Sequence, residues 1–406
     1  MNKNAVSLAD ELEWRGFTHQ TTFVDVENIN EPRAFYLGVD PSAASMHIGN
    51  LAQVMLVKHL IAHGHKAIVL VGGATGMIGD PKEDAERELK TLDEIAKNKA
   101  GIASQYKTLL EGEAFKLVDN YDWFKGIEYL DFLRDIGKHF SMTQLLDREF
   151  IKARIGEGGV GISYAEFSYS LIQGYDFLHL FREHGATMQI GGSDQWGNML
   201  SGAQMIKKLD GAEAHVWTVP LITEKSTGKK FGKSEGNAVW LDPLMTSPYK
   251  FYQFWLNVDD RGVADYIKIF TMIGRDEHEQ LVTEASKDLS KRLLQKYLAY
   301  EVTKLVHGEA RAESARNVTA SLFGDTPFSQ LIDEELDMLA EEIPVVASSH
   351  LLNALVTSGV AASLSEGRRL IDSAAISVNG QKVTEDQPLT TPSIVKKGKN
   401  TFLLVR

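Results

Sequence analysis

Hydrophobic and polar residues alternate in blocks along the first part of the chain, and the blocks predict strands and helices in turn. An apolar run at Ala34–Asp40 is followed by turn residues. Ser45 is then expected to cap a helix whose apolar positions run from Ile48 to Leu60. The continuous apolar run Lys66–Gly73 predicts a parallel strand that is buried on both faces. This strand–helix–strand order is typical of an open α/β sheet, in which ligands bind beyond the carboxyl ends of the strands.

The pattern becomes helical after residue 246 and changes again near the end of the chain. Apolar spacing predicts four helices within 247–324, and an acidic stretch before Pro344 predicts a linker. The segment that follows predicts two short helices, a hairpin that turns at Asn379 and Gly380, and a closing strand. We therefore expect a Rossmann-like domain with a parallel sheet (1–224), a loop and α-helical domain (225–330), an acidic linker (331–345) and a small α+β module (346–406).

The composition excludes several classes of protein. The chain has 406 residues, of which 43% are hydrophobic and 24% are charged, so a disordered or fibrous protein is disfavoured. It contains no Cys, which excludes disulfides, thiolate metal sites and a cysteine nucleophile. No apolar run approaches the roughly 18 residues of a membrane span, and the first residues lack the apolar core of a secretory signal. We therefore expect a soluble, cytoplasmic protein.

The charge is distributed unevenly. Lys and Arg number 43 against 55 Asp and Glu, which gives a net charge of −12. Residues 346–406 nevertheless carry seven basic and four acidic residues. A small basic module on an acidic body can bind a polyanion locally, because electrostatic attraction is screened within about 10 Å at 0.1 M salt. On charge alone, chance variation explains the asymmetry equally well.

Two glycine-rich turns, 72–80 and 191–198, follow predicted strands. Glycine lets the backbone approach a ligand closely. Neither turn has the dinucleotide pattern G-x-G-x-x-G or the P-loop pattern, so a nicotinamide enzyme and a P-loop ATPase are both disfavoured. Taken singly, each segment is more often a tight turn than a nucleotide-binding loop.

Two further segments carry groups that can bind phosphate. His47, Gly49 and Asn50 open the predicted helix after the first strand, where free backbone N–H groups and the helix dipole attract anions. Lys230 and Lys233 lie in a loop rich in glycine and hydroxyl residues, which suits a mobile loop that closes on a polyphosphate. A surface histidine at a helix start and a solvated run of lysines are the ordinary alternatives.

The predicted helix 164–181 is too apolar for the surface, yet it carries polar residues along one stripe. Tyr169, Gln173 and Asp176 have the spacing i, i+4 and i+7. Burying such groups without partners costs about 1–3 kcal/mol each. The stripe therefore faces either a polar ligand or a satisfied network in the core.

Three histidines lie close together in the sequence. His59 and His63 are four residues apart, and His65 follows them. No H-E-x-x-H motif or obvious carboxylate ligand accompanies them, so a metal site is disfavoured. We interpret them as the exposed end of the helix and its turn.

The motifs HIGN (47–50) and KFGKS (230–234) together resemble the paired signatures of class I aminoacyl-tRNA synthetases. The segments GGATGMIGDP, FSYSLIQGYDF and QIGGSDQWGN are similar to those of the bacterial, tyrosine-specific family. The resemblance covers essentially the whole chain, including a C-terminal RNA-binding module. It implies that L-tyrosine reacts with ATP, accompanied by Mg²⁺, to give tyrosyl-adenylate and pyrophosphate. Tyrosine then passes to the terminal adenosine of tRNA(Tyr), releasing AMP. The resemblance also implies a homodimer, and no dedicated protein metal site is identified.

The resemblance further implies roles for individual residues of this chain. The phenol of tyrosine is implied to contact Tyr36 and Asp176. The groups implied around its ammonium are Tyr169, Gln173, Asp80, Thr75 and Gln195. The positions implied on the ATP side are Gly38, Asp40, His47, Gly49, Asn50, Gly192 and Asp194, with Lys230 and Lys233. The residues implied to act on phosphate during catalysis are Ser42, His47, Lys230 and Lys233. Hypothetical phosphate contacts to tRNA are Arg368, Arg369, Lys396, Lys397 and Lys399.

The sequence departs from the family at three positions, none of which removes an essential charge. Asn50 stands where His is frequent, Ser42 where Thr is frequent, and Leu37 where Cys is common. Three other functions stay open. A tryptophanyl synthetase would have no use for Tyr36 paired with Asp176. A small-substrate nucleotidyltransferase would not explain the lysine loop, and a non-enzymatic RNA-binding paralogue predicts eroded catalytic positions.

Overall fold

The computed structural model describes residues 6–81, 88–140, 142, 146, 149–156, 158–234, 237–324 and 326–406. The chain forms two compact units: Met1–Thr246 with Val258–Leu294, and Ser247–Asn257 with Gln295–Arg406. The four-part division expected from the sequence stays a prediction. In the part of the chain that is described, no helix combines the length and the apolar character that crossing a membrane requires.

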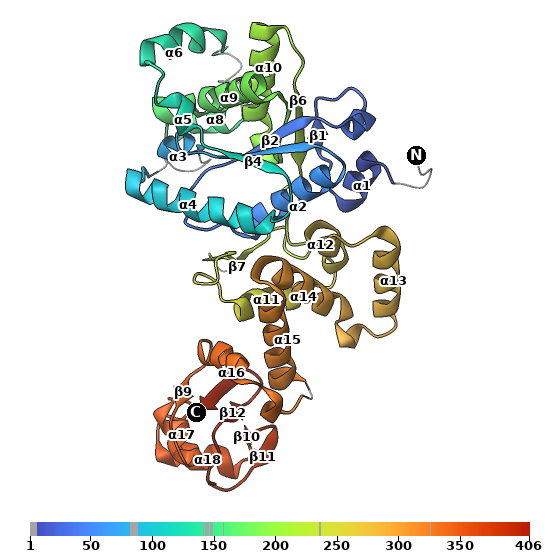
Figure 1. Cartoon of the computed structure of the whole chain (residues 1–406). Helices are drawn as coiled ribbons and strands as arrows, with labels where there is room; N and C mark the ends of the chain where they lie inside the picture. Colours follow the sequence, from blue (N-terminus) through green and yellow to red (C-terminus); the bar gives the residue numbers. More distant parts are fainter. Residues whose placement is uncertain are drawn as a thin grey trace. The chain divides into compact units, whose positions relative to one another are not determined.

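The first unit is built on a six-stranded sheet (Figure 1). Its strands lie in the order β1 (Gln20–Thr21), β6 (His215–Val219), β5 (Ala186–Gly192), β2 (Ala34–Val39), β3 (Lys66–Val71) and β4 (Phe115–Val118). Neighbouring strands are parallel, except that β1 and β6 pair antiparallel. The predicted α/β fold with a parallel sheet is confirmed.

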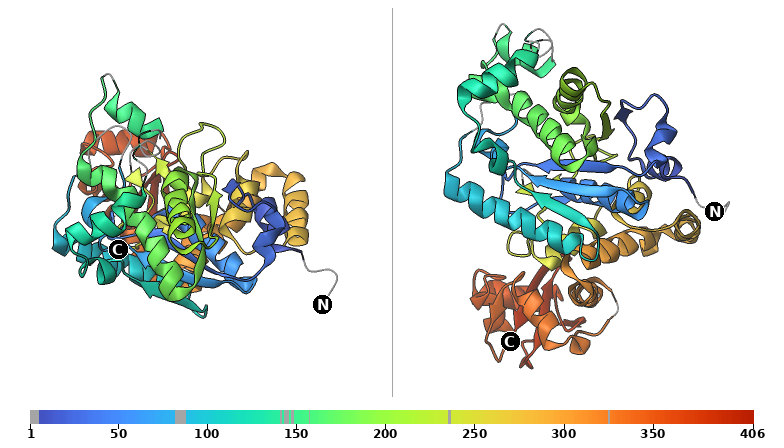
Figure 2. Two further views of the ribbon diagram at one scale, coloured as in Figure 1. Left: turned by 90° about the horizontal axis from the view of Figure 1, so that it is seen from above. Right: turned by 45° about the horizontal axis from the view of Figure 1, so that its top comes forward.

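Helices cover both faces of this sheet. Figures 1 and 2 show α2 (Ile48–Ala62) and α4 (Leu92–Leu109) on one face, and α9 (Tyr164–His184) and α10 (Trp196–Asp210) on the other. Because strands in such a sheet are covered on both sides, their residues are nearly all apolar. Phe35 in β2 and Val69 in β3 are accordingly buried.

Shorter elements complete the first unit. They are α1 (Leu8–Arg15), η1 (Val26–Asn30), α3 (Thr75–Ile78), α5 (Tyr121–Phe124), α6 (Tyr129–Asp135), η2 (Gly137–His139), α8 (Glu149–Ile155), η3 (Ser193–Gln195), β7 (Lys233–Ser234), β8 (Asn237–Ala238), α12 (Val263–Phe270), α13 (Arg275–Ser286) and η4 (Leu289–Lys291). Of these, α12 matters most for the site, because it packs against α1 and α2.

The order of the strands creates a gap at the carboxyl edge of the sheet. From β2 the chain moves outward through β3 and β4, and it returns to the opposite side of β2 to form β5 and β6. The connections after β2 and β5 therefore diverge. In open α/β sheets, ligands bind at this switch point.

The start of α2 differs from the prediction that Ser45 caps it. The capping residue is His47, whose Nδ1 accepts a hydrogen bond from the N–H of Gly49 at 3.0 Å. Asn50 Oδ1 accepts in return from the N–H of His47 at 3.1 Å. The Ser45 hydroxyl is instead buried, where it donates to Met46 O and accepts from Gln105 Nε2 and the N–H of Asp242.

The interpretation of the three histidines as an exposed helix end is also wrong. His59 and His65 are buried, and only His63 is partly exposed. The end of α2 is covered, since the ring of Phe17 lies 6.0 Å from that of His59 and the ring of Phe35 lies 6.3 Å from that of His65. Burial lowers the pKa of His59 to about 3 and that of His65 to about 4. Both rings are therefore neutral parts of the core.

The second unit combines helices with a five-stranded sheet of order β11-β10-β12-β13-β9. The helices are α11 (Pro248–Leu256), most of α14 (Leu293–His307), α15 (Glu309–Phe323), η5 (Phe328–Gln330), α16 (Asp333–Ala340), α17 (Leu351–Thr357) and α18 (Leu364–Asp372). The strands are β9 (Val345–Val346), β10 (Ile376–Val378), β11 (Gln381–Val383), β12 (Ser393–Lys397) and β13 (Thr401–Val405).

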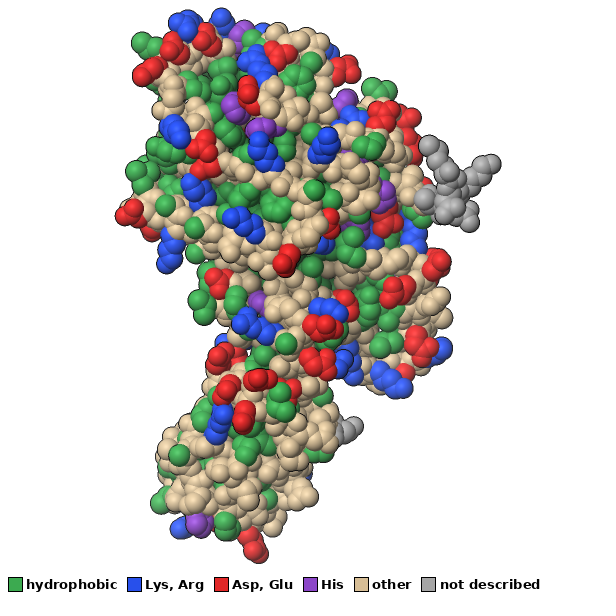
Figure 3. Space-filling model, viewed as in Figure 1, with side chains coloured by type: hydrophobic (Ala, Val, Ile, Leu, Met, Phe, Trp, Pro, Cys, Tyr) green, Lys and Arg blue, Asp and Glu red, His purple; other side chains and the backbone are tan. Residues whose placement is uncertain are grey.

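The segment 331–345, predicted as an acidic linker, contains α16 and the first residue of β9. It is ordered because α16 buries Leu336 and Leu339 in a cluster that also includes Leu404. Strand β9 pairs parallel with β13. Acidic side chains gather over α16 on the face shown in Figure 3.

The hairpin in the second unit turns where the sequence predicts it. Asn379 and Gly380 connect β10 and β11, and both have positive φ, 51° and 86°. Two successive positive φ angles match the twist of the paired strands, and Asn-Gly adopts them at low cost. The prediction of this hairpin is confirmed.

Candidate active site

A cavity of ≈ 300 Å³ lies at the switch point of the sheet. It opens at the carboxyl ends of β2, β3 and β5, and α9 supplies another wall. Of the residues singled out from the sequence, it is lined by Tyr36, Gly38, Asp40, Ser42, Asn50, Thr75, Asp80, Tyr169, Gln173, Asp176, Asp194 and Gln195. Segments far apart in the sequence thus meet around one space.

Helix α9 carries the polar stripe into this cavity. Its start is fixed by a capping box, in which Ser163 Oγ accepts from the N–H of Glu166 at 3.2 Å. Tyr169, Gln173 and Asp176 all line the cavity. The carbonyl oxygen Oε1 of Gln173 is buried without a hydrogen-bond partner among the described residues. Because an unpaired buried amide is costly, this orphaned oxygen favours a polar ligand over a satisfied core network.

One part of the cavity is buried and pairs a phenol with a carboxyl group. Tyr36 and Asp176 are 1% and 2% exposed. Tyr36 Oη has no hydrogen-bond partner in the described part of the chain. Asp176 accepts hydrogen bonds from Asn120 Nδ2 at 3.0 Å and Trp123 Nε1 at 2.9 Å. Burial raises the pKa of Asp176 to about 8 although these two donors lower it, and burial together with the charge of Asp176 raises that of Tyr36.

A second carboxyl group, Asp80, lies where α3 leads out of the glycine-rich turn. It accepts from Gln195 Nε2 at 2.7 Å and from Asn198 Nδ2 at 3.2 Å. Burial raises the pKa of Asp80 to about 6, and the nearby charge of Asp40 adds to the effect. Tyr169 Oη donates to Asp40 Oδ2 at 2.8 Å. Several carboxyl groups thus surround the cavity, which suits a cationic group on the ligand.

The helix-start motif uses its own residues to cap α2. Because His47 Nδ1 accepts from the N–H of Gly49, the proton of a neutral ring is on Nε2, which is then the ring's donor. A Cβ at Gly49 would lie 2.8 Å from His47 Cε1, so glycine is needed here to make room for the imidazole. A Cβ at Gly192 would lie 2.5 Å from Asp194 Oδ1, so a side chain there would require this carboxylate to move.

The lysine loop is joined to this helix start by backbone contacts. The N–H of Ile48 donates to Val239 O, and the N–H of Val239 donates to Gly232 O, both at 3.1 Å. Lys230 is exposed and does not line the cavity. Lys233 begins β7, and its side chain lies outside the part that is described. The two motifs therefore share a backbone framework, while the structure does not bring Lys230 to the cavity wall.

Several polar residues of the site were not singled out from the sequence. Asn120 and Trp123 follow β4, in the polar run DNYDW at the carboxyl end of a parallel strand. Gln189 faces Tyr36 across the β2–β5 pairing, and its Oε1 is buried without a partner among the described residues. Two signals could have indicated them: a turn at the ligand edge of the sheet, and an amide within an apolar strand.

The described residues contain no group of three or more His, Asp or Glu side chains that could hold a metal ion. Phosphate oxygens are suitable ligands for Mg²⁺, which usually keeps several waters and takes only one or two carboxylates from the protein.

The candidate tRNA residues differ in their surroundings. Arg368, Arg369 and Lys399 are exposed. Lys396 Nζ donates to Leu322 O at 3.3 Å, and Lys397 Nζ donates to Val360 O at 2.8 Å. The first three side chains are therefore available to a polyanion, whereas the other two also hold parts of the second unit together.

Comparison with known proteins identifies the family. Residues 27–324 match the family model for class I tRNA synthetases (W and Y), and the chain belongs to that family. Residues 335–406 match the model for the C-terminal domain of SYY-like tyrosine–tRNA ligases. The family resemblance expected from the sequence is confirmed.

Similar full-length relatives are tyrosine–tRNA ligases. That of Bifidobacterium longum (strain DJO10A) is 42% identical over 419 residues, covering 98% of this chain and 94% of the relative. That of Leifsonia xyli subsp. xyli (strain CTCB07) is 43% identical over 412 residues, covering 97% and 92%. A solved structure of a C-terminally truncated mitochondrial tyrosyl-tRNA synthetase from Coccidioides posadasii has a TM-score of 0.68 and 31% identity, covering 77% of this chain and 92% of that one.

Proposed function

We propose that this chain is a tyrosine–tRNA ligase that acts in the cytoplasm. It joins L-tyrosine to ATP, forming tyrosyl-adenylate and pyrophosphate, and then transfers tyrosine to the terminal adenosine of tRNA(Tyr), releasing AMP. The family membership and the tyrosine–tRNA ligase relatives support this activity. The observation that carries the choice of amino acid is the buried pair of Tyr36 and Asp176 at the cavity.

Tyrosine's phenol occupies the space beside Tyr36 and Asp176. Its hydroxyl supplies the partner that Tyr36 Oη lacks, and Asn120 and Trp123 hold the Asp176 carboxyl group in place. Phenylalanine fits the same space but leaves these polar groups unpaired, which is costly in a dry pocket. An indole offers no hydroxyl to this pair, so tryptophan is disfavoured as well.

The ammonium group of tyrosine binds among the acidic and amide side chains. Asp80 and Gln173 contribute oxygens, and Tyr169 contributes its hydroxyl, with Thr75 and Gln195 beside them. The orphaned Oε1 of Gln173 supports this position, since an ammonium has three donors and no acceptor. The tyrosine carboxylate then points toward the ATP side of the cavity.

ATP binds across the start of α2 and the turns after β2 and β5. Gly38, Asp40, Gly49, Asn50, Gly192 and Asp194 surround its adenosine part. The tyrosine carboxylate is already a nucleophile, so the reaction at the α-phosphorus needs alignment and charge stabilisation and no general base. His47 donates through Nε2, and Ser42 through its hydroxyl, to phosphate oxygens. Lys230 and Lys233 neutralise the departing pyrophosphate when their loop closes. Mg²⁺, carried by the phosphates, supplies additional positive charge.

The tRNA is held by the C-terminal module. Arg368, Arg369 and Lys399 are exposed phosphate contacts, with Lys396 and Lys397 beside them. A hollow of ≈ 690 Å³ in the second unit supports this choice, because Lys382, Lys396 and Phe402 are among its lining residues. Cationic and aromatic side chains together suit phosphates and bases of RNA.

The active form is a homodimer of the first unit. Apolar side chains are exposed in and around α6 and the start of α9: Tyr129, Leu130, Val160 and Tyr164. The hydroxyls of Tyr129 and Tyr164 lie 3.5 Å apart, and exposed apolar side chains that gather on a surface mark a protein interface. A second copy of the chain covers this surface.

Pyrophosphate exchange with each of the twenty amino acids tests the proposal. We expect exchange with tyrosine alone, and charging of tRNA(Tyr) transcripts by the same preparation. Exchange with tryptophan in place of tyrosine, or RNA binding without any exchange, would contradict the assignment.

A further inference from the structure

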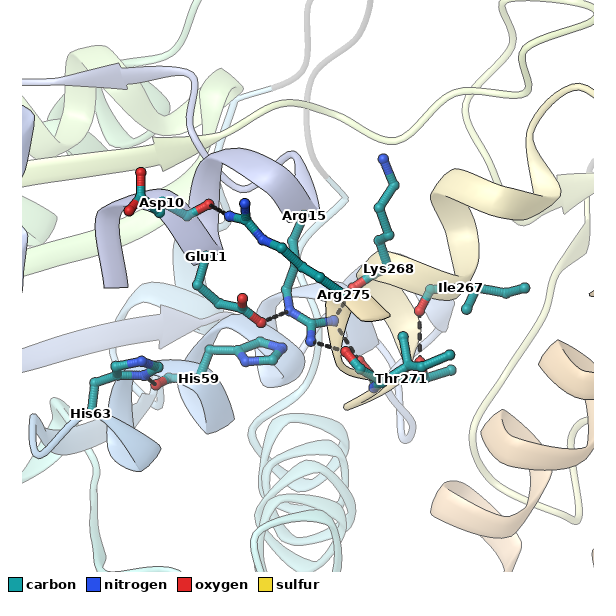
Figure 4. Close-up of polar contacts among 10 residues, drawn as sticks. Asp10, Glu11, Arg15, His59, His63, Ile267, Lys268, Thr271 and Arg275 are labelled. Carbon is teal, nitrogen blue, oxygen red and sulfur yellow. Dashed lines mark hydrogen bonds and ion pairs between the residues drawn. The ribbon is translucent and has the colours of Figure 1, made fainter. Parts of the chain in front are cut away.

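Arg15 belongs to none of the motifs found in the sequence, and its side chain is buried against α12, the helix that contacts the lysine loop. Arg15, the last residue of α1, is 2% exposed. Its guanidinium donates to three backbone carbonyls at and after the end of α12: Lys268 O at 2.5 Å, Thr271 O at 2.9 Å and Ile273 O at 2.5 Å. Its Nε donates to Glu11 Oε1 at 2.6 Å. Figure 4 shows the side chain between α1 and this end of α12.

This arrangement fixes the end of α12 in two ways. The last carbonyls of a helix have no partner within it, and the helix dipole places partial negative charge there. Arg15 supplies both the missing donors and a positive charge. Thr271 Oγ1 donates to Ile267 O at 2.7 Å, which closes the last turn from within. A planar fork can reach several carbonyls at once, whereas a lysine ammonium has its three donors on a single nitrogen.

Helix α12 in turn holds the aromatic residue of the KFGKS motif. The ring of Phe231 lies 4.3 Å from that of Tyr266 and 6.0 Å from that of Phe270, measured between centroids. Phe231 is 8% exposed, although its neighbour Lys230 is exposed. Tyr266 Oη also donates to Thr223 O at 3.1 Å, at the chain segment that leads into the loop.

The residue after Phe231 meets the helix-start motif directly. Gly232 has a φ of 78°, and a Cβ built there would lie 2.3 Å from Ile48 Cγ1. Ile48 is the first residue of α2 and follows His47. The base of the lysine loop therefore packs against two elements: the aromatic rings of α12 and the first turn of α2.

We propose that Arg15 is a positioning residue for tyrosine activation, because it locks α12 and thereby sets the base of the loop that carries Lys230 and Lys233. The proposal rests on the proposed function of those lysines. Arg15 touches no substrate. It acts through Tyr266, Phe270 and Phe231, and a shift of α12 displaces the loop relative to His47. Misplacing a catalytic group by about 1 Å can cost up to roughly 100-fold in rate.

The first experiment separates activation from tyrosine binding in Arg15→Lys. We expect kcat of tyrosine-dependent pyrophosphate exchange to fall about 10-fold and KM for ATP to rise, with the tyrosine Kd unchanged within about twofold. The matched control is Leu109→Ala, which truncates a buried side chain at the end of α4 and should leave kcat per folded enzyme unchanged. An Arg15→Lys enzyme with the original kcat, or with tyrosine binding and exchange lost in parallel, overturns the proposal.

The second experiment tests the route, and its single variants do not require a soluble Arg15 variant. Phe231→Leu should lower kcat to a similar degree, while Tyr266→Phe, which keeps the ring, should stay within about threefold of the original. The double variant Arg15→Lys/Phe231→Leu should be no slower than Phe231→Leu alone. Additive losses, or an unchanged kcat in Phe231→Leu, overturn the proposal. If the unaltered protein itself shows no exchange, the proposed function fails instead.

Discussion

The proposed tyrosine end and the proposed ATP end of the cavity are built from different kinds of structure. The tyrosine end consists of buried side chains on regular elements, with Tyr36 on β2 and Asp176 on α9, and with Asn120 holding the carboxyl group. The proposed ATP end consists of helix-start groups and glycine turns, and Lys230 lies exposed outside the cavity wall, in a loop whose backbone contacts the start of α2. A rigid end suits discrimination between amino acids that differ by one hydroxyl, whereas a loop suits a charge that develops only as pyrophosphate departs.

The largest effect that would sharpen this contrast is expected at the loop. In Lys233→Ala, the rate of adenylate formation should fall by about 100-fold or more, because a charge that acts on the transition state is lost. Tyrosine affinity should stay within about twofold. Single-turnover adenylate formation and equilibrium binding of tyrosine measure the two quantities. Loss of tyrosine binding with chemistry intact would show that the two ends are not separate in function.

The next effect is expected at the tyrosine end. Here the use of tyrosine should suffer, whereas the loop variant should affect the chemical step. Asp176→Ala should lower kcat/KM for tyrosine by roughly 10- to 100-fold, because a hydrogen bond to a charged or buried group is removed. The already low exchange with phenylalanine should change much less. Parallel exchange assays with both amino acids give the ratio, and equal losses for both would remove Asp176 from hydroxyl recognition.

The sequence predicted the elements of the site better than its supporting contacts. Buried strands such as Lys66–Val71 were evident because a parallel sheet needs continuous apolar runs. The stripe on α9 was evident because helical spacing brings i, i+4 and i+7 together. Asn120 and Gln189 were not predicted as site residues, because their place in the site depends on which strands are neighbours in the sheet. His59 and His65 were misjudged because the rings that lie against them, Phe17 and Phe35, come from outside this helix and its turn, and the local pattern does not reveal them.

Asn120, which the sequence analysis did not single out, is expected to give a third and smaller effect, on tyrosine binding. Asn120→Ala removes the hydrogen bonds that Nδ2 donates to Asp176 Oδ2 at 3.0 Å and to Thr75 Oγ1 at 3.1 Å, and the one that Oδ1 accepts from the N–H of Ala74 at 2.7 Å. At about 1 kcal/mol for such a bond, KM for tyrosine should rise about fivefold while kcat changes little. Asn98→Ala serves as the control, because that amide donates to Pro41 O outside the phenol site. A change in kcat larger than that in KM would show that Asn120 serves the activation step and not tyrosine binding.

The last effect is on stability and not on rate, and it concerns the proton on Asp176. Because burial raises its pKa to about 8, this carboxyl group keeps its proton in the folded protein and loses it in the unfolded chain between about pH 4 and pH 8. The contribution of this group to stability is therefore lost as pH rises through that window. Asp80, with a pKa of about 6, acts in the same direction but only below pH 6.

The contributions of Asp176 and Asp80 can be distinguished, because each variant should change the thermal midpoint in a different pH range. Without tyrosine, the thermal midpoint of the first unit should fall from pH 6 to pH 8, and Asp176→Asn should flatten that fall. Asp80→Asn should remove the loss of stability that Asp80 causes between about pH 4 and pH 6, a range in which the buried His59 and His65 act in the opposite direction, and should leave the upper range as it was. Calorimetry across pH 4 to 9 measures both. If Asp176→Asn left the fall between pH 6 and 8 unchanged, the carboxyl group would already be ionised there, and the tyrosine end would be less dry than its burial implies.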